Sequence, residues 1–184
     1  MHDAYVLGKD RRLTYIEMTE RIMGAVRQNL EVCAVFYGHP GIFVNSSHMA
    51  IKQAREEGYA ARMLPAVSAQ DCLFADLGVD PADGIQIFEA SNFLVRPRRF
   101  DVNTALVLFQ IGIVGNTILK ELGAFKKGLN ILVDYLLKFY TDDHPIILYE
   151  ASRLGLEPPL IQRHNLAELR NAPVKATTTL YIYP

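Results

Sequence analysis

The sequence has little cysteine and no long apolar run, and each shortage excludes a class of protein. Its only cysteines are Cys33 and Cys72, which lack the CxxC spacing typical of metal sites and lie inside apolar runs. This favours reduced core thiols and a cytoplasmic protein. The longest apolar runs, such as 105–109, are far too short to span a bilayer, and neither end has the pattern of a signal peptide. We therefore expect no membrane association.

Charge of either sign is not in excess. The formal net charge is −1, and basic residues are scattered apart from the run Arg96-Pro-Arg-Arg99. We therefore expect no nucleic-acid partner and no polybasic membrane surface. Four histidines, at positions 39, 48, 144 and 164, show no close metal-ligand spacing, so no metal site is predicted. Half of the residues are hydrophobic, which is enough for a packed globular core.

In the first half of the chain, helical patterns alternate with short apolar runs. The pattern Thr14-x-x-Glu17 has the form of a capping box at the start of a helix that ends near Asn29. The alternation predicts a parallel α/β sheet, in which ligands gather at the carboxyl ends of the strands. The expected strands are 32–37 and 62–65, and the expected helices are 47–57, with Gly58 as C-cap, and 68–77, with Gly78 as its stop.

The second half predicts another α/β unit. Residues 84–91 alternate like a strand, and the segment 93–100 after them follows neither regular period. We therefore expect an amino-terminal α/β domain over residues 1–95 and a carboxyl-terminal α/β domain over residues 96–184. The expected elements of the second are strands at 104–111, 145–151, 160–164 and 177–183, and a helix at 127–140.

Two motifs carry a family resemblance: Tyr37-Gly-His-Pro-Gly-Ile-Phe43 and Leu64-Pro-Ala-Val-Ser-Ala-Gln-Asp71. Followed by Phe74-Ala-Asp-Leu-Gly-Val-Asp-Pro81 and Glu89-Ala-Ser91, they resemble the tetrapyrrole methylase superfamily of S-adenosylmethionine-dependent methyltransferases. Within it, the chain is most similar to borosin-type peptide backbone N-methyltransferases, because generic members tend to have aspartate at the position of His39. Further matches at 108–112, 149–151 and 178–182 extend the resemblance over nearly all of the chain.

This resemblance implies a two-domain α/β fold. It has a parallel sheet in the first domain, here lacking its first strand, and a mixed sheet in the second. S-adenosylmethionine would lie in the cleft between the domains of a protein that is usually a homodimer. Gly38 and Gly41 would let the backbone approach the ligand closely, and Ser68 at a helix start would offer amide donors. The implied cofactor-binding residues are Tyr37, Gly38, His39, Phe43, Ser68, Ala69, Gln110, Tyr149, Ala151, Thr178 and Thr179.

The resemblance also implies a catalytic group, in which Tyr5, Arg11 and Tyr15 surround the target amide and Tyr37 faces them. An amide nitrogen is a poor nucleophile because its lone pair is delocalised into the carbonyl. A tyrosine beside a guanidinium has its phenolate favoured, so we expect Tyr5 or Tyr15 to act as general base, a role that arginine cannot take. The enzyme would otherwise align nitrogen, methyl and sulfur for in-line displacement.

The chain departs from the family pattern at both ends and in one loop. Family members normally begin with a further strand, a glycine-rich turn and a helix before the position of Tyr5, and Ala66 stands where they usually have glycine. The residues up to Pro184 include no core peptide, so we expect the substrate to be a separate precursor peptide, methylated in trans. Two alternatives stay open: methylation of a tetrapyrrole or another small substrate, and an inactive fragment or peptide-binding partner.

Overall fold

We describe the protein from a computed structural model, which covers residues 2–96, 98–116, 126–152 and 157–184. Its contacts divide the chain into two compact units. The first contains the described residues up to Ser68, and the second contains those from Ala69 onwards. Each unit is described by itself. In the described part of the chain, no helix combines the length and the apolar character needed to cross a membrane.

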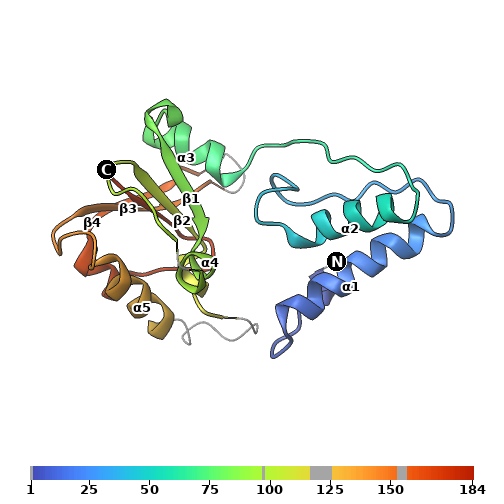
Figure 1. Cartoon of the computed structure of the whole chain (residues 1–184), viewed down its shortest axis with the longest axis horizontal. Helices are drawn as coiled ribbons and strands as arrows, with labels where there is room; N and C mark the ends of the chain where they lie inside the picture. Colours follow the sequence, from blue (N-terminus) through green and yellow to red (C-terminus); the bar gives the residue numbers. More distant parts are fainter. Residues whose placement is uncertain (1, 97, 117–125, 153–156) are drawn as a thin grey trace. The chain divides into compact units, whose positions relative to one another are not determined.

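Two helices, α1 (Arg11–Val26) and α2 (Asn45–Glu56), lie side by side in the first unit (Figure 1). A short 3-10 turn, η1 (His2–Ala4), precedes them. Helix α1 begins before the predicted Thr14, because the Asp10 carboxylate accepts a hydrogen bond of 2.7 Å from the backbone N–H of Arg12 and so caps the helix. Thr14 is buried, and its hydroxyl donates to the carbonyl of Ala4 at 3.3 Å. The predicted capping box at Thr14 was therefore wrong.

The helix pair has a small apolar core and an ionic edge. Ile22 and Met23 of α1 are buried, as are Ala50 and Ala54 of α2, whose small side chains let the helices approach closely. At the edge, Arg27 donates from Nε to Glu57 at 2.8 Å and from Nη2 to the other carboxylate oxygen at 2.5 Å. Gly58 has a φ of 86° just after α2, as expected of a residue that ends a helix.

The two strands predicted in the first unit do not form. Residues 32–37 and 62–65 carry no strand assignment, and 87% of Val35 and 61% of Leu64 are exposed. A strand is stabilised by the hydrogen-bonded ladder with its neighbour. Neither segment has such a neighbour in the described part of the chain, so the parallel sheet expected in the first domain is absent from these residues. Cys33, expected in a core, is exposed for the same reason.

The space between the helices and these extended segments is an apolar cavity of about 680 Å³. Ile22 and Val26 of α1 and Ile51 of α2 line one side, while residues 29–34 and 59–64 line the other. The side chains that predicted a buried strand thus face a cavity or solvent in this structure.

The second unit is built on a five-stranded mixed sheet in the order β1-β2-β5-β3-β4. Strand β1 runs parallel to β2, and the other pairs are antiparallel, in line with the mixed sheet expected in this half. Because β1 pairs with β2, residues 69–95 group with the second unit, whereas the sequence suggested a boundary after residue 95. The strands are β1 (Ile85–Glu89), β2 (Ala105–Phe109), β3 (Pro145–Glu150), β4 (Leu160–Asn165) and β5 (Thr179–Ile182).

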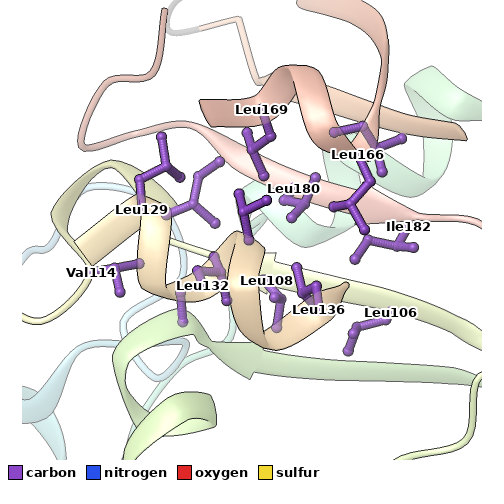
Figure 2. Packing of buried hydrophobic residues seen from close by; sticks show 14 of the residues in the cluster. Leu106, Leu108, Val114, Leu129, Leu132, Leu136, Leu166, Leu169, Leu180 and Ile182 are labelled. Atoms are coloured by element: carbon purple, nitrogen blue, oxygen red, sulfur yellow. The ribbon is translucent and has the colours of Figure 1, made fainter. Parts of the chain in front are cut away.

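Helices cover both faces of this sheet. All five residues of the interior strand β2 are buried, and they alternate between two apolar clusters. Leu106 and Leu108 pack with Leu132 of α5, as Figure 2 shows, while Val107 packs with Leu73 of α3 on the opposite face. The other elements are α3 (Ala69–Leu77), α4 (Ala90–Val95), α5 (Lys126–Leu136) and the 3-10 turns η2 (Pro81–Asp83), η3 (Ile111–Ile113) and η4 (Leu166–Asn171).

Candidate functional site

The two motif loops of the first unit lie next to each other. Gly38 has a φ of 71°, a conformation that favours glycine. A Cβ built on it would lie 3.6 Å from the carbonyl oxygen of Val67, in the second motif. Ser68, at the end of that motif, is buried and directly precedes α3, as predicted. The structure therefore brings Gly38 and the Val67–Ser68 segment together without the sheet that was expected to align them.

Side chains of the first loop and of α2 hold the loop in shape. The backbone N–H of Gly41 donates to Nδ1 of His39 at 2.9 Å, so this imidazole nitrogen carries no proton. The carbonyl of Gly41 accepts from Nε2 of His48 at 2.8 Å. The hydroxyl of Ser47 donates to the carbonyls of Pro40 and, at 2.9 Å, Val44.

These bonds give His39 a defined role within its own loop. The resemblance implies that His39 contacts the cofactor, and here its ring turns back onto the following glycine. Phe43, a second implied contact, has a φ of 56°, which is uncommon for a residue with a side chain. These bonds thus hold the loop in a specific conformation.

Three of the four predicted catalytic residues lie together. The guanidinium carbon of Arg11 is 5.9 Å from the centroid of the Tyr15 ring, within the range of a cation–π interaction. Tyr5 is close enough for both residues to influence its pKa. Tyr37 lies at the start of the first motif loop, and 81% of its surface is exposed.

The structure corrects one expectation about this group. We expected Arg11 to favour the phenolate of a neighbouring tyrosine, yet the pKa of Tyr5 is raised above its usual value. Partial burial is the main cause, because it disfavours the charged form, and Tyr15 adds to the effect. Arg11 acts in the opposite direction, but too weakly to reverse it. The raised pKa favours the protonated phenol of Tyr5, which can donate a hydrogen bond.

In the second unit, four predicted residues gather at one edge of the sheet. Strand β2 ends just before Gln110, β3 ends just before Ala151, and β5 begins at Thr179. The backbone N–H of Ile111 donates to the carbonyl of Thr178 at 3.3 Å, which ties the first of these segments to the last. Gln110 has a φ of 61° and is left-handed, an uncommon conformation for a non-glycine residue.

The fifth predicted residue, Tyr149, faces elsewhere. Its side chain is fully buried, and its hydroxyl donates to Oδ2 of Asp76 on α3 at 2.6 Å. Burial, followed by the hydrogen bond to Asp76, raises the pKa of this tyrosine. The side chain therefore fastens α3 to the sheet. Asp76 carries no motif signal of its own, so sequence reasoning missed this contact.

Sequence reasoning also missed Glu150 and Lys175. The carboxylate of Glu150 accepts from the hydroxyl of Thr178 at 2.8 Å and from Nζ of Lys175 at 3.1 Å. The position of Glu150 inside the motif Tyr149-Glu-Ala151 was the available signal.

Comparison with known sequences supports the resemblance over most of the chain. Residues 4–169 match the model of the Tetrapyrrole (Corrin/Porphyrin) Methylases family. The methyltransferase/ribosomally synthesized cyclic peptide omphalotin A precursor of Omphalotus olearius is 42% identical over 189 residues, which span 100% of this chain and 45% of that protein. A methyltransferase/type III borosin cyclic peptide precursor of Anomoporia bombycina is 41% identical over 181 residues, or 96% of this chain and 21% of that protein. The chain thus spans less than half the length of these relatives.

Solved structures show the same fold. Uroporphyrin-III-C-methyltransferase from Thermus thermophilus aligns with a TM-score of 0.64 at 17% identity, covering 91% of this chain and 70% of that one. The cobalt precorrin-4 methyltransferase CbiF aligns with a TM-score of 0.63 at 12% identity, covering 92% and 70%. The mixed α/β fold that the sequence implied is confirmed. From the family match and these relatives, the chain belongs to the tetrapyrrole (corrin/porphyrin) methylase family.

Proposed function

We propose that the protein is an S-adenosylmethionine-dependent methyltransferase that methylates backbone amide nitrogens of a separate precursor peptide. The observation that carries this proposal is the grouping of Tyr5, Arg11 and Tyr15 in a chain 42% identical to a combined methyltransferase and cyclic peptide precursor. The homodimer implied by the same resemblance and the cytoplasmic location expected from the cysteine usage are also part of this proposal.

The cofactor proposal is supported by the donor chemistry of each unit. In the first, Gly38 has no side chain of its own that could keep a ligand from the backbone, and it lies beside the carbonyl of Val67. In the second, the left-handed Gln110 carries a side-chain amide that can bond a ligand, at the sheet edge that also carries Ala151. A structural neighbour, another uroporphyrin-III C-methyltransferase structure with a TM-score of 0.57, was solved with S-adenosylhomocysteine. When bound, S-adenosylmethionine would supply an electrophilic methyl group.

The first-unit cluster can prepare an amide for methylation. An amide nitrogen becomes nucleophilic as its proton leaves and negative charge builds on the carbonyl oxygen. Arg11 supplies a fixed positive charge for that oxygen, and the neutral Tyr5 hydroxyl can donate a hydrogen bond to it. Because Tyr5 is held protonated, Tyr15 is the better candidate for the base that accepts the amide proton.

Mass spectrometry of a candidate peptide tests this proposal. The purified protein is incubated with S-adenosylmethionine and the precursor peptide encoded nearest to it, and the peptide is analysed by fragmentation. We expect added methyl groups on backbone nitrogens. Arg11→Lys keeps the positive charge but loses the planar guanidinium with its paired N–H donors. It should therefore slow methylation while leaving the cofactor affinity unchanged.

Binding measurements separate the alternatives. If calorimetry detects S-adenosylhomocysteine binding but no peptide is methylated, the peptide substrate is refuted and a small-substrate methyltransferase is favoured. If no binding is detected, this chain is an inactive fragment or a peptide-binding partner. The tetrapyrrole substrates of the structural neighbours do not support a similar substrate here, since 17% identity shows the fold alone.

A further inference from the structure

Glu150 stands out among the residues at the sheet edge that carries Gln110 and Ala151. It is the last residue of β3, and only 12% of its side chain is exposed. Withdrawing a carboxylate from water costs free energy unless hydrogen bonds replace the lost solvation. Two donors do so here: the Thr178 hydroxyl on one oxygen and Lys175 Nζ on the other.

The Glu150 carboxylate restrains a tight turn over residues 175–178. The backbone N–H of Thr178 donates to the carbonyl of Lys175 at 3.0 Å, which closes the turn. The hydroxyl of Thr178 accepts from the backbone N–H of Lys175 at 2.8 Å and donates to Glu150. One hydroxyl thus joins the turn to the end of β3.

The 175–178 turn also restrains the loop after β2. A Cβ built on Gly112 would lie 2.1 Å from the carbonyl oxygen of Lys175, so the two backbones are in direct contact. The N–H of Ile111 donates to the carbonyl of Thr178 immediately after Gln110. A left-handed conformation is strained in a residue that has a Cβ, and it persists only where the surroundings hold it. The turn supplies that restraint.

We propose that Glu150 is a positioning residue of the cofactor site: its carboxylate fixes the 175–178 turn, which holds Gln110 in its left-handed conformation at the sheet edge that also carries Ala151, where its side chain would meet the cofactor. This inference rests on the proposed function, because it concerns residues expected to bind S-adenosylmethionine. Glu150 acts through Thr178 and the turn, without contacting the ligand.

A set of variants separates the hydrogen bond from the charge. Glu150→Ala removes both acceptors, and we expect affinity for S-adenosylhomocysteine to fall at least about tenfold, the equivalent of 1.4 kcal/mol. Glu150→Gln keeps an oxygen that accepts the Thr178 hydrogen bond, so we expect the affinity to fall only about threefold or less. In Lys175→Ala the affinity should fall still less, because 62% of the lysine side chain is exposed and its backbone N–H is unaffected. Glu157→Ala, at an exposed position, is the neutral control.

Thr178→Val tests the chain of contacts itself. It removes the hydroxyl that links Glu150 to the turn, so it should weaken binding as much as Glu150→Ala, and the double variant should lose little more. Additive losses would show that the two residues act separately and would overturn the proposal.

Two readouts keep this inference distinct from the proposed function. In the ligand-free protein, the amides of residues 110–114 should exchange hydrogen faster in Glu150→Ala than in Lys175→Ala. In the enzyme, Glu150→Ala should raise the KM for S-adenosylmethionine and largely retain kcat. Unchanged exchange, or a lower melting temperature with unchanged affinity, would overturn the positioning role. Failure of the unaltered protein to bind S-adenosylhomocysteine would refute the proposed function, and the exchange data would still decide whether Glu150 holds the loop.

Discussion

Replacing Tyr149 with phenylalanine tests whether its hydroxyl fastens α3 to the sheet. The ring fills a fully buried position between α3 and β3, so the substitution leaves packing intact and removes one hydrogen bond of 2.6 Å to Asp76. A hydrogen bond to a charged group contributes about 1.5–3 kcal/mol. Asp76 is exposed and regains water when the donor is lost, so the expected loss of stability lies near the lower end, about 1–2 kcal/mol.

The assay is urea unfolding followed by circular dichroism, with thermal melting as a second probe. A loss of 1–2 kcal/mol corresponds to roughly 2–8 °C in melting temperature for a chain of this size. Tyr183→Phe is the matched control. The Tyr183 hydroxyl accepts a hydrogen bond of 2.9 Å from Arg163 in an exposed position, so this variant should lose about 0.5 kcal/mol of stability or less.

The same variant predicts a pH effect and a binding result. Because the folded state raises the pKa of Tyr149, its contribution to stability is present below pH 10, the usual tyrosine value, and declines as the pH rises further. Tyr149→Phe should therefore flatten part of the alkaline loss. Its affinity for S-adenosylhomocysteine should not change. A stability no lower than that of Tyr183→Phe, or a clear loss of affinity, would refute the assignment of the hydroxyl to Asp76.

Three other predictions concern the loops and the surface charges. Gly112→Ala should destabilise the second unit by at least about 2 kcal/mol in urea unfolding, because the new Cβ meets the Lys175 backbone at 2.1 Å. Gly24→Ala, in the last turn of α1, should stabilise the protein by roughly 0.5–1 kcal/mol, because nothing lies within 4 Å of the added Cβ. His39→Leu should weaken S-adenosylhomocysteine binding roughly two- to twelvefold, the equivalent of one neutral hydrogen bond of about 0.5–1.5 kcal/mol, and His39→Asn should restore it by accepting the same N–H; equal losses in both would contradict a role for that bond. The stability of the first unit, followed by hydrogen exchange, should decline as the pH falls from 4.5 towards 2. The fold lowers the pKa of several salt-bridged carboxyl groups, so these groups stabilise the folded state above their usual pKa values and lose that contribution when they are protonated. The groups concerned are Asp3, Glu17, Glu20 and Glu57.

Features set by neighbours along the chain were predictable from the sequence. The helix stops at Gly58 and Gly78 have positive φ, because glycine meets no Cβ penalty there. The apolar run at 104–111 became β2, and the mixed sheet of the second half followed the pattern of its strands. The start of α1 was the local failure, since Asp10 competed with Thr14 as the cap.

Features that depend on distant residues could not be predicted. Residues 32–37 are as apolar as β2, but a strand also needs a partner, and the described chain offers none beside them. The motif loops identified candidate ligand contacts, yet only the tertiary structure showed that His39 accepts a hydrogen bond from Gly41 and that Tyr149 donates one to Asp76.

By itself, the sequence determined the family, the grouping of Tyr5, Arg11 and Tyr15 as candidates, and most helix ends, because motifs and caps depend on residues close together in the chain. The tertiary structure decided which apolar segments pair, which way the pKa of Tyr5 shifts, and that Glu150 supports the turn beside Gln110. The reason is physical: strand pairing, loss of solvation and buried hydrogen bonds depend on groups far apart in sequence, and only folding brings them into contact.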